Sequence, residues 1–123
     1  MKRTAARELA FKTIYSKFFN PETEIEIEEG DKEGLEFTSK ILTSFAENYE
    51  AINETISSHL KGYTISRLFK VDLAIITLAV IELNYIKENP KEVIINEAVE
   101  LAKKFSTEKS PRFINGVLAD IIK

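Results

Sequence analysis

The chain has no cysteine and no tryptophan, and it has a single histidine, His59. Without cysteine it can form no disulfide, thiolate zinc site, iron–sulfur cluster or cysteine nucleophile, and it is compatible with a reducing compartment. No apolar run reaches the ~18 residues of a membrane span, and the first residues do not form a signal peptide. We therefore expect a cytoplasmic protein that does not bind a membrane.

Residues suited to catalysis or metal binding are also scarce. His59 lies on or beside the apolar seam of a predicted helix with no orienting partner nearby in the sequence, so we interpret it as a packing or surface residue. The four glycines form neither a phosphate-binding loop nor a dinucleotide fingerprint. The acidic residues between 22 and 36 lack the spacing of a calcium loop. We expect no enzyme activity, no catalytic residue, no metal and no cofactor.

The charges are unevenly distributed along the chain. The net charge is −3, but residues 1–17 hold five basic residues against one acidic residue. Residues 22–36 hold eight acidic residues against one basic residue, and the rest of the chain is balanced. An acidic protein does not bind nucleic acid over its whole surface, yet this distribution leaves room for one focused basic patch.

The spacing of apolar residues predicts helices along most of the chain. Apolar residues recur at three- and four-residue intervals over 4–19, 35–60 and 92–105. The second of these segments is predicted as one long helix that ends at Gly62. Residues 71–86 are apolar on nearly every side, and they are too many for a usual strand, so we predict a central helix packed all round.

The remaining segments connect these helices. We interpret residues 63–70 as a connector with one helical turn, and residues 21–34 as an irregular or weakly helical acidic connection. Ser110 and Pro111 predict the start of the last helix, because serine can cap a helix and proline is tolerated in the first turn. Five or six helices with short joints indicate an all-α bundle, in a single domain over residues 1–123.

Two clusters of basic residues are candidates for binding nucleic acid. Arg3 and Arg7 are neighbours on the first predicted helix. Arg7 falls close to the apolar stripe, so it either lies in solvent where the helix projects beyond the core or forms a partly buried ion pair. Phe113, which either packs in the core or lies at its rim, adjoins the second cluster: Lys103, Lys104, Lys109 and Arg112. Cations that hold phosphates beside a ring that stacks on bases would suit single-stranded RNA.

Several motifs resemble those of the NusB family of bacterial transcription antitermination factors. Near the C-terminus these are Ile-Asn-Glu-Ala at 95–98, Glu-Leu-Ala-Lys at 100–103 and Phe-Ile-Asn-Gly-Val-Leu at 113–118. Near the N-terminus, Ala-Arg-Glu at 6–8 leads to Tyr-Ser at 15–16, which is similar to the opening of the same family. The resemblance spans the chain and is weakest between residues 21 and 34.

The resemblance implies a fold, a function and partners. The fold would be a compact all-α bundle of about six or seven helices in two small packed halves. The function would be to bind boxA-type single-stranded nascent RNA together with the ribosomal protein NusE, as a scaffold rather than a catalyst, notably on rRNA operons. Other Nus factors and RNA polymerase would be reached through that complex. Some members form homodimers that bury the RNA surface, so a homodimer is a further possibility.

The resemblance also implies site residues. By position, the RNA-binding set is Lys2, Arg3, Arg7, Tyr15, Lys109 and Phe113. Asp72, at the start of the central helix, is the predicted contact with a protein partner. The competing hypothesis is a helical adaptor or homodimer that binds only proteins and has little RNA affinity of its own.

Overall fold

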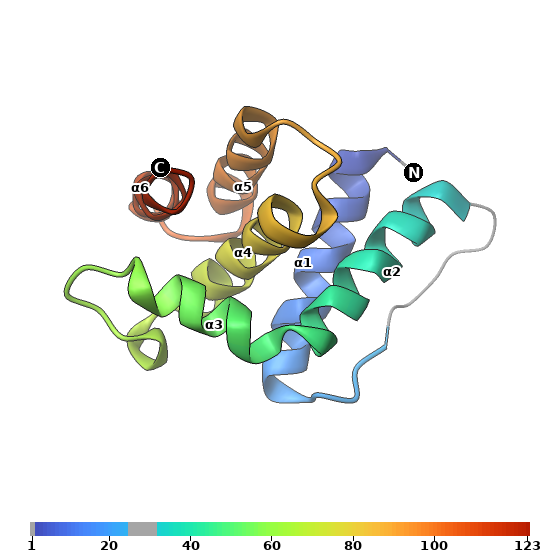
Figure 1. Cartoon of the computed structure of the whole chain (residues 1–123), viewed down its shortest axis with the longest axis horizontal. Helices are drawn as coiled ribbons and strands as arrows, with labels where there is room; N and C mark the ends of the chain where they lie inside the picture. The colour runs from blue at the N-terminus through green and yellow to red at the C-terminus, as the bar shows by residue number, and fades with distance from the viewer. Residues whose placement is uncertain (1, 25–31) are drawn as a thin grey trace.

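The computed structural model describes residues 2–24 and 32–123, and every regular element in these ranges is helical. Figure 1 shows the arrangement of the helices. The elements in chain order are α1 (Arg3–Phe19), α2 (Lys32–Glu47), α3 (Tyr49–Ser58), the 3₁₀ turn η1 (Ile65–Arg67), α4 (Lys70–Ile81), the π turn η2 (Glu82–Ile86), α5 (Lys91–Phe105) and α6 (Ser110–Ile121). None of these helices is long and apolar enough to cross a membrane.

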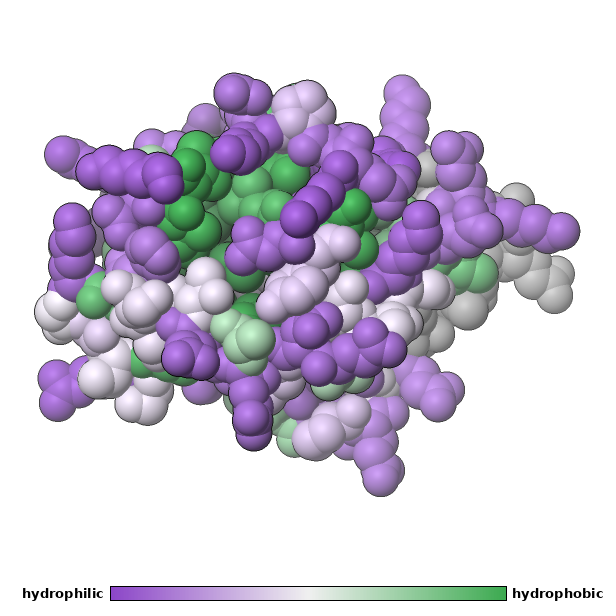
Figure 2. Space-filling view, in the orientation of Figure 1, coloured by the Kyte–Doolittle hydropathy of each residue, from purple (hydrophilic) through white to green (hydrophobic). Residues whose placement is uncertain are grey.

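The core is built around α4. Every residue of this helix from Asp72 to Ile81 is buried, because α1, α3, α5 and α6 all pack against it. Figure 1 shows α4 in the middle of the molecule, with α1 and α2 on one side and α5 and α6 on the other. The prediction of an all-α bundle in two packed halves around a central helix is confirmed. In Figure 2, hydrophilic side chains cover most of this face, and hydrophobic surface shows between them over α5.

The single long helix predicted over 35–60 is wrong. The backbone leaves the helical conformation at Asn48, with φ −121° and ψ 21°, so that α2 and α3 are separate helices. The side-chain amide of Asn48 donates a hydrogen bond to the Ser44 carbonyl (3.2 Å), which also accepts the backbone N–H of Asn48 (2.9 Å). The predicted apolar positions Ile52 and Ile56 are still buried, because α3 presents the same periodic face to α4.

Two helix ends also differ from expectation. The central helix ends its regular hydrogen bonding at Ile81 and continues as the π turn η2, which stops at Lys87 in the left-handed conformation, with φ 57°. Ser110 does not cap α6, since the N-cap residue is Lys109 and the Ser110 side chain is buried. Pro111 does lie in the first turn of α6, as predicted. The predicted acidic connection lies partly outside the described residues.

Candidate nucleic-acid interface

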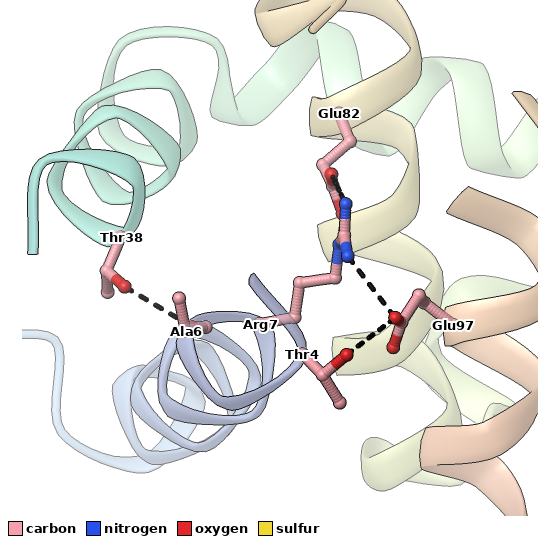
Figure 3. A network of polar contacts seen from close by, with 6 residues as sticks. All are labelled: Thr4, Ala6, Arg7, Thr38, Glu82 and Glu97. Atoms are coloured by element: carbon pink, nitrogen blue, oxygen red, sulfur yellow. Dashed lines mark hydrogen bonds and ion pairs between the residues drawn. The ribbon is translucent and has the colours of Figure 1, made fainter. Parts of the chain in front are cut away.

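Arg7 lies inside the protein, at the centre of a polar network between helices (Figure 3). Its side chain is only 2% exposed. Its Nε donates to Glu82 Oε2 at 2.8 Å and its Nη2 to Glu82 Oε1 at 2.9 Å, which is the two-pronged geometry of a strong arginine–carboxylate pair. Its Nη1 lies 3.4 Å from Glu97 Oε1. Of the two alternatives for Arg7, the ion pair is the one confirmed, and this conformation offers its guanidinium to no phosphate.

The Arg7 network joins the two halves of the fold. Glu82 belongs to the π turn after α4, and Glu97 belongs to α5. The Thr4 hydroxyl donates to Glu97 at 2.8 Å, so that two residues of α1 bind the same carboxylate. On the other side of α1, the Thr38 hydroxyl of α2 lies 3.3 Å from the Ala6 carbonyl and shares its one proton between this oxygen and the nearer Gly34 carbonyl at 3.0 Å. The start of α1 is therefore fixed from both sides.

Arg3 reaches the surface, but its charge is already compensated. Its Nη2 donates to Glu88 Oε1 at 3.2 Å, and its guanidinium carbon lies 4.0 Å from the centre of the Phe37 ring. Lys40 binds the other Glu88 oxygen at 3.3 Å. The hydrogen bond from Arg3, with a smaller contribution from Lys40, holds the pKa of Glu88 below its usual value. Lys2 is exposed beside this cluster.

Tyr15 belongs to a row of aromatic rings farther along α1. The Tyr15 and Phe11 ring centres are 6.5 Å apart, and Phe11 lies 5.3 Å from Phe105 of α5. Two lysines cover the Phe105 ring, since the ammonium groups of Lys12 and Lys104 each lie 5.3 Å from its centre. This surface combines aromatic and cationic groups and contains residues that were not in the predicted site.

One of the two lysines over Phe105 is strongly paired. Lys104 Nζ donates to Glu8 Oε1 at 2.6 Å, and Lys12 Nζ lies 3.3 Å from Glu8 Oε2. The hydrogen bond from Lys104 is the main reason that the pKa of Glu8 is lowered. The basic pair at 103–104 and the phenylalanine after it are the sequence signals that could have indicated this surface, but we assigned the pair to the cluster beside Phe113. That Phe105 and Lys104 pack against α1 could be seen only in the folded structure.

The joint between α5 and α6 is held against the central helix by Asp72. The Ser106 and Ser110 hydroxyls each donate to one of the two carboxylate oxygens of Asp72. Ser110 Oγ also accepts the backbone N–H of Thr107 at 3.3 Å. Asp72 is only 7% exposed, so its carboxylate serves the joint and presents little surface to another protein. The role of Asp72 as a partner contact stays a prediction.

Lys109, Arg112 and Phe113 follow directly from this joint. Phe113 is half-buried and packs on the core cluster, and its ring meets the Tyr63 ring edge-to-face with centres 5.6 Å apart. The position of Phe113 at the rim therefore combines both of the alternatives considered for it. Lys109 and Arg112 are exposed, and neither has an ion pair with any residue that the structure describes.

The predicted RNA-binding residues thus fall into separate places. Lys109 and Phe113 lie together at the start of α6, whereas Lys2 and Arg3 lie at the start of α1 and Tyr15 lies in the aromatic row. Figure 1 shows the start of α1 and α6 toward opposite sides of the molecule. A ligand that contacts all of these residues must be extended.

Comparison with known proteins agrees with the fold. The model of the NusB family matches residues 4–123 of the chain. The chain belongs to the NusB family. The transcription antitermination protein NusB of Bacillus cereus strain B4264 is 42% identical over 127 aligned positions, which cover 98% of this chain and 97% of that protein.

Solved structures of the family are similar over nearly the whole chain. A structure of T. maritima NusB is 33% identical, with a TM-score of 0.91, and the match covers 98% of this chain and 90% of that one. A crystal structure of the antitermination factors NusB and NusE in complex with dsRNA contains a chain that is 29% identical. That match has a TM-score of 0.85 and covers 97% of this chain and 94% of that one.

Proposed function

We propose that this NusB-family protein is an RNA-binding antitermination factor. It binds boxA-type nascent RNA together with the ribosomal protein NusE, notably on rRNA operons, and acts as a scaffold in the cytoplasm. Other Nus factors and RNA polymerase join through that complex. Related proteins named as antitermination factors, one of them in a complex with NusE and RNA, support the proposal.

The observation that carries the RNA-binding proposal is at the start of α6. Two exposed cations, Lys109 and Arg112, have no carboxylate partner among the described residues and flank a pair of aromatic rings, Phe113 and Tyr63. Unpaired cations bind phosphate without first losing a protein ion pair, and exposed ring surface stacks on bases. Single-stranded RNA supplies both groups at once.

A second part of the RNA path is the aromatic row of α1. Phe105 lies under Lys12 and Lys104, with Tyr15 two rings away, but both lysines pair with Glu8, so this part of the path offers less free charge than the start of α6. Extended RNA that starts at Phe113 and continues along α1 toward Lys2 and Arg3 would contact all the exposed predicted residues. Arg7 stays outside this path, because it is buried.

The alternative function is a protein-binding adaptor. It is favoured by the carboxylates that already compensate Arg3 and Lys104, together with the net charge of −3. On this hypothesis the same surface engages NusE or a second copy of the chain. A homodimer that covers the surface would compete with RNA by mass action.

Titration of fluorescently labelled boxA RNA, with and without purified NusE, tests the proposal. We expect the wild-type chain to bind the RNA and NusE to tighten the complex. Lys109→Ala is expected to weaken RNA binding several-fold and to reduce the salt slope of log affinity by about 0.7, the value for one phosphate contact with a single strand.

The matched control is Lys91→Ala. Lys91 is also exposed, and it begins α5 at the end opposite the joint. The Lys91→Ala substitution removes the same charge but should leave the salt slope of RNA affinity nearly unchanged. No RNA binding by the wild-type chain at low salt, with NusE binding intact, would establish the adaptor instead.

A further inference from the structure

A groove lies between α5 and α6 at the surface of the protein. It has a volume of about 550 Å³. The two helices pack against each other, and Figure 1 shows them side by side. Apart from Arg112, the residues of this groove do not belong to the proposed RNA path. Those that matter for its chemistry are Glu92, Ile95, Asn96 and Val99 of α5, with Arg112 and Asn115 of α6.

Two asparagine side chains line this groove, one from each helix, and the fold makes no use of their amides. Asn96 and Asn115 are exposed, and neither amide has a hydrogen bond to any residue that the structure describes. Both lie in the interior of a helix, where asparagine is less favourable than alanine. The side-chain amide of Asn48, in contrast, bonds to a backbone carbonyl. The requirements of the helices therefore do not explain these two asparagines.

Unpaired amides on two helices suit the backbone of an extended peptide. A side-chain amide both donates and accepts hydrogen bonds, and an extended peptide has free N–H and C=O groups to match it. A helical segment offers few such groups, because its own hydrogen bonds satisfy most of them. The amide chemistry of the groove therefore favours an extended segment over a helix.

The floor of the groove is aliphatic. Ile95 and Val99 are half-buried and lie one helical turn apart. From Glu92 to Val99 the groove follows α5 for roughly 10 Å, at a rise of about 1.5 Å per residue. This is the length of about three extended residues at roughly 3.3 Å each. Because alternate side chains of an extended segment point to the same side, one or two aliphatic side chains of such a segment can contact the floor.

The charges of the groove balance. Glu92 and Arg112 are exposed, and neither has an ion pair with any residue that the structure describes. The lining has one charge of each sign and no aromatic ring, whereas single-stranded RNA is bound by cations and stacking rings. A peptide with one acidic and one basic side chain is complementary to both charges.

We propose that this groove binds an extended segment of a partner protein. Asn96 and Asn115 form hydrogen bonds with the backbone of the segment, and Ile95 and Val99 contact its aliphatic side chains. Arg112 and Glu92 select an acidic and a basic side chain beside them. This protein contact is additional to the RNA surface, so its test does not depend on RNA binding.

The test uses peptides with blocked ends, in which three valines lie between an aspartate and a lysine, in both orders. Valine favours the extended conformation. Binding to the isotope-labelled full chain is followed by NMR, and the side-chain amide signals of Asn96 and Asn115 are assigned by their loss in alanine variants. We expect both signals to shift and to saturate with at least one of the two peptides. N-methylation of the valines removes their backbone N–H donors and should weaken binding several-fold.

Alanine variants test the two amides separately. Asn96→Ala and Asn115→Ala should each bind the peptide about fivefold more weakly, as for the loss of one hydrogen bond, and should be at least as stable in urea unfolding. The matched control is Asn84→Ala, which changes an exposed asparagine outside this groove and should bind the peptide like the wild type. Asn96→Ala should keep its RNA affinity, whereas Lys109→Ala should weaken RNA binding and leave peptide binding unchanged.

Three results would overturn the proposal. The first is that neither amide signal shifts with either peptide in millimolar excess. The second is that binding is equally strong in the Asn96→Ala and Asn115→Ala variants or with N-methylated peptides, since the contact would then be apolar association without recognition of the backbone. The third is that boxA RNA shifts both amide signals and binds Asn96→Ala more weakly, which would assign the groove to RNA.

Discussion

The start of α1 and the start of α6 each carry a cluster of basic residues, but the two clusters differ in what surrounds them. Arg7 binds two carboxylates in the interior, and Arg3 binds Glu88 at the surface. Lys109 and Arg112 have no such partner among the described residues. The start of α1 therefore uses its arginines mainly for structure, whereas the start of α6 leaves its cations available.

This difference shows why a count of basic residues does not locate an RNA surface. A compensated cation must give up its carboxylate before it gains a phosphate, so much of the electrostatic gain is lost. An uncompensated cation at the surface has no protein ion pair to break, so it gains the full interaction with a bound phosphate. The density of arginine in the first residues is thus a weaker indicator of RNA affinity than two unpaired cations beside aromatic rings.

The largest expected effect that tests this difference between the starts of α1 and α6 is on the stability of the fold. Arg7→Met leaves Glu82 buried without its main partner, and removal of one member of a buried pair costs about 3–5 kcal/mol. We expect the free energy of unfolding in urea to fall by that amount, while the folded variant keeps most of its RNA affinity.

The double variant Arg7→Met with Glu82→Leu serves as the control. Because it removes both buried charges, it should recover much of the lost stability. If Arg7→Met were as stable as the wild type and bound RNA far more weakly, Arg7 would be a phosphate ligand and the two regions would not differ.

The second effect concerns the joint that presents Lys109 and Phe113. Asp72→Ala leaves the Ser106 and Ser110 hydroxyls without their shared acceptor, and we expect a loss of about 1–3 kcal/mol in urea unfolding. Asp72→Asn retains one carbonyl acceptor and should lose less. NusE affinity of the folded variants should be unchanged. Weaker NusE binding with full stability would instead identify Asp72 as the partner contact expected from the sequence.

Local signals predicted the fold well, and pairings distant in the sequence account for what they missed. Periodicity placed the apolar faces correctly, but it did not detect the break at Asn48, because α3 continues the same buried face after the break. The helical spacing placed Arg7 beside the apolar stripe of the first helix, yet its partners Glu82 and Glu97 lie 75 and 90 positions farther along the chain. The role of Asp72 likewise depends on serines more than 30 positions away.

The smallest effect, and the sharpest for the comparison, comes from releasing Arg3. Glu88→Gln removes the carboxylate shared by Arg3 and Lys40, and we expect RNA affinity to rise about two- to fivefold, with a salt slope steeper by about 0.7 per phosphate gained. Glu92→Gln is the matched control, since Glu92 is an exposed glutamate of the first turn of α5 and changes the net charge equally. Equal effects of the two variants would show that Arg3 is not restrained by Glu88.

The same variant has a pH signature in stability. The folded pKa of Glu88 is lowered, so its ion pairs stabilise the fold above the unfolded pKa of about 4.3, and this contribution disappears as the pH falls through the folded value. Glu88→Gln should therefore be slightly less stable than the wild type at pH 7, by under about 1 kcal/mol for surface pairs, and the difference should vanish once the pH is below the folded pKa of Glu88. Urea unfolding of both proteins across this range measures the difference. A difference that persisted in acid would mean that Glu88 stabilises the fold by packing rather than by its charge, and that its ion pair with Arg3 adds nothing measurable to stability.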